Sequence, residues 1–448
     1  SVGWNIMEED FWKESKVSDI VSNLKPRLSY GVNGNVNGIG NYEVYGEYAQ
    51  VDAKTYGGAT ALYNKKLLNT NLRWEQSQTF EVGLDIGFLQ NRFSFILDFY
   101  SRRTKDLLTK QALPGYTGFS DIVTNMGTLR NSGFEAEVKA NIINKGGFTW
   151  DMTANITSVA NKIISLPYNN VENNRVGGYE VAAGKVDADG KFPTKWIAGR
   201  QEGGKLGELV GYRQQHVFKD WDDVKQHANL RVDEVANLYG PGLADQINPA
   251  TGKTYKESSG WQPIEPGDAC WEDINGDNII NGYDRSVMGN IFPNVTGGFS
   301  TTFGYKGLSL YARFDYALGH TLYNDLKARS LGQYQGQFNI ITDVKDMWSE
   351  ANPNSDLTKF YYADQLAKKN ITRSNNASTA ADNNSSRYYE KGDYLALREI
   401  TLSYQLPKSL ISKAHLTEAS VYVTGQNLFY ITGYDGVSPE PAVSTTYG

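Results

Sequence analysis

Apolar and polar residues alternate along many stretches of this chain. In one stretch the apolar residues occupy every second position: Phe93, Phe95, Leu97 and Phe99. Ser94 and Asp98 fall between them and point to the opposite side. The segments 134–142, 148–156 and 308–316 repeat this period of two. The alternation predicts β-strands that have one apolar face and one polar face.

The alternation and the turn residues between the stretches predict ten strands. We expect them near residues 1–6, 24–34, 74–88, 92–104, 125–143, 147–163, 295–305, 308–318, 393–406 and 419–430. Three pairs are joined by tight turns at 90–91, 144–147 and 306–307. The other connections are much longer, at 36–73, 105–124, 164–294, 319–392 and from 431 onward, whereas 7–23 and 407–418 are intermediate.

Short and long connections therefore alternate along the chain. This is typical of an outer-membrane barrel, which has short periplasmic turns and long extracellular loops. A β-sandwich with Greek-key links gives no reason for such sorting. One more descending strand would return the chain to the periplasm, which makes about 11 strands, half of a barrel of roughly 22. We therefore predict an all-β fold, the C-terminal part of a plugged transmembrane antiparallel barrel with long extracellular loops.

The same pattern divides the chain into three regions. Residues 1–163 hold barrel strands with short periplasmic turns, and residues 164–294 form a long extracellular loop region. A connection of that length is expected to carry small structure of its own. Residues 295–448 hold the C-terminal barrel strands, without the final one. Because the chain starts without Met or a signal peptide and stops in a loop, we expect a fragment of a longer protein.

Aromatic residues recur at the ends of the expected strands. They are Tyr30, Trp74, Tyr100, Trp150, Tyr305, Tyr404, Phe429 and Tyr430. They fit the aromatic girdles at the two interfaces of a membrane. The alternative is the ordinary preference of aromatic residues for any strand.

Composition excludes several other classes of protein. No stretch approaches the roughly 20 consecutive apolar residues that a spanning helix needs. The mean hydropathy of -0.49 still suits a barrel, whose strands alternate lipid-facing and polar residues. The single cysteine, Cys270, rules out an intrachain disulfide framework and is expected to be a packed small residue. The net charge of -6 argues against a nucleic-acid partner.

A twelve-residue stretch in the longest connection has the spacing of a calcium loop. Its oxygen ligands would be Asp273, Asn275, Asp277, the Ile279 carbonyl, Asn281 and Asp284. Asn278 stands where such loops usually have glycine, but asparagine tolerates the left-handed conformation. We expect Ca²⁺ there, ahead of Mg²⁺, in a structural role. The alternative is a hydrated turn in which these side chains bond only to the backbone.

Aromatic residues in the long connections are candidates for contacting a substrate. Trp196, Trp221, Trp261 and Tyr334 would stack on sugar rings or anchor a partner protein. The alternative is that these residues hold their own loop together. No phosphate-binding loop and no nucleophile motif accompanies them, so we predict no catalytic residues.

Several blocks in order along the chain resemble one family. They are Asn71–Ser77, Glu81–Asp85, Asn125–Glu135, the loop Asp273–Asp284, Met288–Pro293, Gly392–Ile400, Gly425–Phe429 and Ser438–Glu440. Together they are similar to the C-terminal part of the SusC/RagA class of TonB-dependent transporters of the outer membrane. Residues 170–265 match no block of that family.

The resemblance implies a function beyond what the residues show. It implies a barrel of roughly 22 strands, a plug and TonB box upstream of this chain, a SusD-like lipoprotein as a lid, and a TonB complex that supplies energy. The expected activity is import of an oligosaccharide or a peptide; the sequence leaves the substrate open. The alternatives are a secreted, Ca²⁺-binding β-rich adhesin or glycan-binding protein and a polysaccharide-degrading enzyme.

Overall fold

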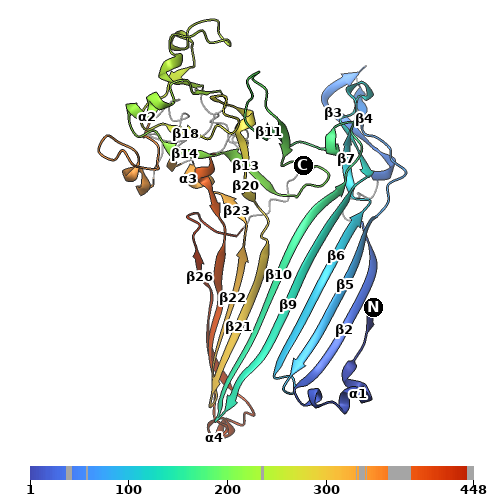
Figure 1. Cartoon of the computed structure of the whole chain (residues 1–448). Helices are drawn as coiled ribbons and strands as arrows, with labels where there is room; N and C mark the ends of the chain where they lie inside the picture. Colours follow the sequence, from blue (N-terminus) through green and yellow to red (C-terminus); the bar gives the residue numbers. More distant parts are fainter. Residues whose placement is uncertain are drawn as a thin grey trace.

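The chain forms one large antiparallel sheet that carries loop structures at one end (Figure 1). The computed structural model describes residues 1–36, 43–56, 59–233, 237–328, 330–331, 339, 341–361 and 385–440. Ten strands follow one another in the sheet in chain order. They are β1 (Val2–Gly3), β2 (Val21–Asn35), β5 (Glu75–Phe88), β6 (Phe93–Lys105), β9 (Thr128–Lys145), β10 (Phe148–Ser165), β21 (Val295–Tyr305), β22 (Leu308–Leu318), β25 (Tyr394–Gln405) and β26 (Ser420–Thr432).

These ten strands are the ten that the alternation predicts. The largest difference is β1, which pairs with β2 only through Val2 and Gly3. Tight turns follow β5, β9 and β21, as expected. At the first of them Gln90 and Asn91 both have positive φ angles, of 60° and 61°. With Leu89, which has a φ angle of 52°, three consecutive left-handed residues reverse the chain within this short turn.

The connections are sorted by length between the two ends of the sheet. At one end lie the short turns and two connections with single-turn helices, α1 (Asp10–Lys13) and α4 (Lys408–Ile411) (Figure 1). All the long connections leave from the other end. The predicted sidedness is therefore confirmed within the described residues.

One face of the sheet is polar across all its long strands. The register aligns Arg27 of β2 with Gly83 of β5, and Gly83 with Asp98 of β6. The Arg27 guanidinium bonds to Asp98 at 2.8 Å and to Asp85 at 2.9 Å. A Cβ atom on Gly83 would collide with Asp98 and stand 2.8 Å from Arg27, so only glycine leaves room for this ion pair.

The opposite face is apolar and uncovered. Its exposed side chains include Leu28, Phe80, Phe99, Leu310, Leu402 and Val423. Phe99 is 58% and Val423 is 68% exposed. Soluble proteins rarely expose a continuous apolar surface of this extent. A sheet with these two faces fits a barrel wall whose apolar side meets lipid.

The aromatic-girdle prediction is wrong for Tyr100 and Tyr430. Tyr100 is in register with Gly133, and a Cβ on that glycine would stand 2.6 Å from its ring, so the ring covers Gly133 on the polar face. The Tyr430 hydroxyl accepts a 3.1 Å hydrogen bond from Arg398, also on the polar face. A residue's position near a strand end does not determine the face of the sheet on which its side chain lies. Successive side chains point to opposite faces, so the face depends on whether the residue is an odd or an even one along the strand.

The long connections carry short elements of their own. The hairpins are β3 (Glu47–Tyr56) with β4 (Ala59–Lys66), β7 (Leu108–Ala112) with β8 (Asp121–Asn125), and β11 (Tyr179–Ala182) with β12 (Thr194–Ile197). The strands β23 (Thr321–Tyr323) and β24 (Tyr389–Lys391) pair across the long connection between β22 and β25. Between β10 and β21 also lie β13 (Glu208–Tyr212), β14 (Gln214–Val217), α2 (Trp221–Gln226), β15 (Arg231–Val232), β16 (Leu238–Tyr239), β17 (Gln262–Pro263), β18 (Ala269–Trp271), β19 (Ile279–Ile280) and β20 (Arg285–Asn290). Helix α3 (Asp325–Ala328) follows β23.

None of the helices in the described ranges combines the length and the apolar character that a membrane crossing requires.

Neighbouring residues of β6 provide a test of the two faces. Leu97 lies on the apolar face, whereas Ile96 lies on the polar face between Asp85 and Glu137. We expect Leu97→Arg to destabilise the membrane-inserted barrel by about 2–4 kcal/mol, because it places a charge in hydrocarbon. The matched variant Ile96→Arg should assemble normally. The measurement is folding into lipid vesicles, followed by heat-modifiable gel migration; equal loss in both variants would contradict the assignment of faces.

Candidate functional site

The connection between β10 and β21 folds around an apolar core of its own. Its buried members are Tyr212, Phe218, Val224, Leu230, Val232, Leu238, Ile264, Ala269, Cys270, Trp271 and Ile280. Hereafter this unit is called the loop domain. Burial raises the pKa of the Cys270 thiol to about 12, which agrees with a packed residue rather than a nucleophile. The expectation that this connection carries its own structure is confirmed.

The candidate calcium loop is anchored directly in that core. Its strand β19 pairs in parallel with β15, and the Ile280 side chain has no exposed surface. Asn278, at the sixth position of the loop, has a φ angle of 63°. This is the left-handed conformation that the sequence predicts for a residue replacing the usual glycine. The backbone therefore turns at Asn278 in the way that the usual glycine of this position allows.

The aspartates of the loop bind its backbone. The two carboxylate oxygens of Asp273 accept hydrogen bonds from the Gly276 and Asn278 amides, at 2.6 and 2.8 Å. Those of Asp284 accept from the Ile274 and Asn281 amides, at 2.8 and 2.9 Å. Each of these oxygens thus has one backbone donor. A carboxylate oxygen has two acceptor sites, so one remains for a cation.

Electrostatics favour a cation in the same place. The Asp284 side chain has no exposed surface. Burial, together with the nearby charges of Asp273 and Asp277, raises its pKa to about 6. The ammonium group of Lys185 bonds to the Asp273 backbone carbonyl at 3.2 Å. A divalent cation bound to the carboxylates would offset the cost of burying Asp284 in its charged form.

In the described part of the chain, no group of three or more His, Cys, Asp or Glu side chains is placed to hold a metal ion. A calcium ion bound here would also need the amide oxygens of Asn275 and Asn281 and the Ile279 carbonyl. Asn275 is fully buried and donates to Asp277 at 3.0 Å, a contact that a bound cation would replace. Calcium binding therefore stays a prediction, supported by the backbone turn and the buried carboxylate.

The candidate substrate aromatics do not form one cluster. Trp196 of β12 is covered by the Arg175 guanidinium, 3.5 Å from the ring centroid. Trp261 packs edge-on against Tyr255, with ring centroids 5.0 Å apart. Trp221, the first residue of α2, is 54% exposed. Tyr334 lies outside the described residues. Trp196 and Trp261 thus support their own loops, and Trp221 is the candidate that faces solvent.

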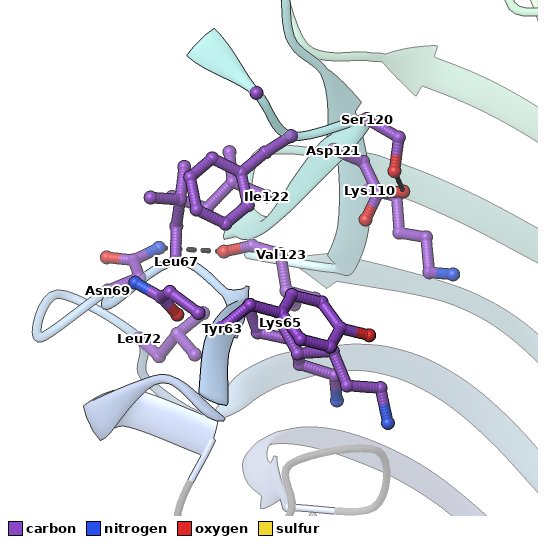
Figure 2. Close-up of a pocket in the computed structure, with 14 residues that line it drawn as sticks. Tyr63, Lys65, Leu67, Asn69, Leu72, Lys110, Ser120, Asp121, Ile122 and Val123 are labelled. Atoms are coloured by element: carbon purple, nitrogen blue, oxygen red, sulfur yellow. Dashed lines mark hydrogen bonds between the residues drawn. The ribbon is translucent and has the colours of Figure 1, made fainter. Parts of the chain in front are cut away.

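A hollow between two other loop hairpins was not predicted from the sequence. It has a volume of about 480 Å³ and lies between β3–β4 and β7–β8 (Figure 2). Its polar residues come from segments more than 40 positions apart, such as Lys65 and Lys110. No local motif marks them. The alternation of residues within each short hairpin was a local signal for the hairpins themselves. Which hairpins lie side by side, however, is decided by the tertiary structure.

The two-faced sheet, its sorted connections and its folded loops define a class, the outer-membrane β-barrels. Residues 12–262, more than half of the chain, match the family described as "TonB dependent receptor-like, beta-barrel". The chain belongs to this family of TonB-dependent receptors, so it is an outer-membrane protein and not an enzyme.

Curated relatives agree with the family. TonB-dependent receptor P3 of Formosa agariphila is 27% identical over 441 residues, 98% of this chain and 38% of that receptor. TonB-dependent receptor SusC of Bacteroides thetaiotaomicron is 39% identical over 175 residues, 37% of this chain and 17% of that receptor. The chain spans well under half the length of these relatives. The resemblance to the SusC/RagA class is confirmed.

Solved structures show the same fold. The structure of the RagAB peptide transporter superimposes with a TM-score of 0.67 at 22% identity, covering 98% of this chain and 40% of that one. The RagAB peptide importer in its "open-open" state gives a TM-score of 0.66 over 98% of this chain and 39% of that one. The predicted fold class, part of a transmembrane antiparallel barrel, is confirmed.

Substitution of Asp277 tests the calcium loop. We expect Asp277→Asn to weaken Ca²⁺ binding about tenfold, since affinity depends on the number of charged ligands. The substitution keeps the oxygen that accepts from the Ile279 amide at 2.7 Å. Calorimetric titration of the chelator-treated receptor measures the change, with Asp189→Asn as a control outside the loop. Absence of binding heat in the unaltered receptor, with unchanged protease sensitivity of the loop domain, would refute the site.

Two tryptophans of the loop domain should respond differently to truncation. Trp271→Ala removes a ring that is 2% exposed and should destabilise the loop domain by about 3–5 kcal/mol. Trp221→Ala should leave stability unchanged within about 0.5 kcal/mol and reduce substrate binding if the exposed ring contacts substrate. Limited proteolysis and ligand titration measure the two effects. Unfolding of the loop domain by Trp221→Ala would assign this residue a structural role instead.

Proposed function

We propose that this chain forms part of the barrel wall and of the extracellular loops of an active importer of oligomeric nutrients. The importer takes up a glycan or a peptide across the outer membrane and works with a SusD-like lipoprotein on the cell surface. The names of its relatives support this reading, since they include SusC and a peptide importer, RagAB. Family membership sets aside the alternative of a secreted adhesin.

The observation that most directly supports this proposal is the continuous polar face of the sheet. Residues that the sequence predicts to line an aqueous lumen share this face by register: Asp98, Glu135, Glu137, Arg313 and Asp315. Asp98 stands directly opposite Glu135 in adjacent strands. A water-filled interior is the environment that accommodates so many charges on one side of a membrane-spanning sheet.

Charge pairs keep this face ordered. Arg398 holds Asp315 of the adjacent strand, with one bond of 2.9 Å, and also bonds to Glu440 and Tyr430. At the other side of the sheet Arg27 holds Asp85 and Asp98. Both guanidiniums cross strand boundaries, so they fix neighbouring strands while presenting hydrophilic groups to a passing solute.

The proposal also assigns the source of energy and the gate. In the proposal, an upstream plug closes the barrel and the TonB complex displaces it. The loop domain, stiffened by Ca²⁺, would hold the extracellular end in the shape that receives the substrate and the lipoprotein.

Uptake by intact cells tests the proposal. Cells that carry the full-length receptor should accumulate a fluorescently labelled oligosaccharide or peptide from a size-graded set, and deletion of the receptor gene should abolish this. Because TonB coupling uses the protonmotive force, a protonophore should stop uptake while leaving surface binding unchanged.

A second readout concerns the partner. Affinity purification of the receptor in mild detergent should recover a lipoprotein in equal amount. Uptake that persists with the protonophore, or that is the same in the deletion strain, would overturn the proposal.

A further inference from the structure

A polar hollow lies at the loop end of the sheet, away from the loop domain. It opens between the hairpins β3–β4 and β7–β8 and measures about 480 Å³. Figure 2 shows Lys110, Ser120 and Asp121 on one wall, with Tyr63 and Lys65 on the facing wall. A volume in this range holds one or two sugar rings and falls within that of ligand pockets.

The two walls are tied together at the base of the hollow. The Asn69 side chain, just after β4, donates a 2.7 Å hydrogen bond to the Val123 carbonyl of β8 (Figure 2). Next to it, the Asn125 side chain accepts from the Arg73 amide and donates to the Arg73 carbonyl, both at 2.7 Å. These side-chain bonds join segments more than 50 positions apart. The hollow is therefore held open by contacts between the hairpins.

Positive charge is in excess around the hollow. The ammonium groups of Lys65 and Lys66 share one carboxylate, that of Glu47, at 3.2 and 3.6 Å. Lys110 is exposed and has no ion-pair partner in the described part of the chain. The Asp121 carboxylate accepts a 2.9 Å hydrogen bond from the Ser120 hydroxyl. Among the residues that line the hollow, three are lysines, Lys65, Lys66 and Lys110, and one, Asp121, is an acid.

A ligand can compete with Glu47 for the ammonium groups of Lys65 and Lys66. The side chains of Lys65, Lys66 and Glu47 are each 44–49% exposed. Exposed ion pairs of this kind contribute little to stability. An incoming anion can therefore bind the lysines at small cost to the protein, and the exposed Lys110 offers it a further ammonium group.

Tyr63 gives the hollow an apolar contact surface. Its ring is 47% exposed and lines the hollow beside Lys65 (Figure 2). An aromatic ring with a polar tip suits a ligand that has both an apolar face and polar edges. A pyranose ring has this combination, and Asn64, Ser120 and Asp121 supply hydrogen-bonding groups for its hydroxyls. The aromatic ring and the hydrogen-bonding groups beside it favour a sugar as the ligand of this hollow.

We propose that this hollow is a binding subsite for an anionic oligosaccharide, in which Lys110 and the pair Lys65–Lys66 hold a carboxylate or a sulfate group and Tyr63 contacts the ring. This rests on the proposed import function and narrows its substrate class. The charged group is the shared chemistry of uronic acids and sulfated sugars.

Direct binding to the detergent-solubilised receptor tests the subsite. The probes are oligogalacturonate for the carboxylate, sulfated chondroitin oligosaccharide for the sulfate, a neutral malto-oligosaccharide of equal length, and oligoglutamate. At least one anionic saccharide should bind tenfold or more tightly than the neutral one, and its affinity should fall as salt rises. Lys110→Gln should weaken that binding about tenfold, the effect of one lost charge-assisted hydrogen bond. Lys110→Arg should restore most of it.

Matched variants distinguish binding at the subsite from nonspecific attraction to positive charge on the receptor. Lys253→Gln removes an exposed lysine of the loop domain and should leave binding unchanged. Tight oligoglutamate binding that depends on Lys110 would replace the saccharide with an acidic peptide, and equal affinity for neutral and anionic sugars would overturn the charge argument. If uptake of neutral oligomers by cells continues while every anionic probe fails, the subsite is refuted and the import function stands. Loss of all energy-dependent uptake would refute the import function itself.

Discussion

The cross-strand register of the ten-stranded sheet is the constraint on which the rest of the structure depends. Because side chains alternate at a period of two, a slip of one residue between neighbouring strands would send every charge to the apolar side. Arg27 illustrates how the register is held. Its guanidinium reaches carboxylates on two successive strands across Gly83, the only residue type that leaves room for it. The ion pairs therefore fix the register and line the polar face at once.

The same chain uses two opposite rules of burial. In the sheet, apolar side chains such as Phe99 and Val423 are uncovered and meet lipid, while the charges face inward to water. In the loop domain, Trp271 and Ile280 are sealed inside an apolar core. Both regions minimise apolar contact with water; they differ only in the solvent that surrounds them.

Contacts between the long connections join the loop domain to segments that leave other strands, and join those segments to one another. The Tyr389 hydroxyl of β24 donates a 2.8 Å hydrogen bond to the Val210 carbonyl of β13, which joins connections that leave different strands. The His320 ring, which is 1% exposed, contacts the Pro439 carbonyl at 3.0 Å. Calcium in the Asp273–Asp284 loop would act on the same assembly, because Ile280 of that loop belongs to the loop-domain core. A structural ion would thus influence the shape of the extracellular end without touching substrate.

The sequence by itself determined the strands, their turns and the sidedness of the sheet, because alternation and turn chemistry are local properties. It also located the left-handed Asn278 and the ligand spacing of the calcium loop, which lie within twelve residues. Tertiary structure alone decided which aromatics are accessible: Trp221 and Trp271 look equivalent in the sequence, yet one is exposed and the other buried. It also assigned Tyr100 and Tyr430 to the polar face and assembled the lysine-lined hollow. Those features arise from pairing between distant segments, which no local pattern records.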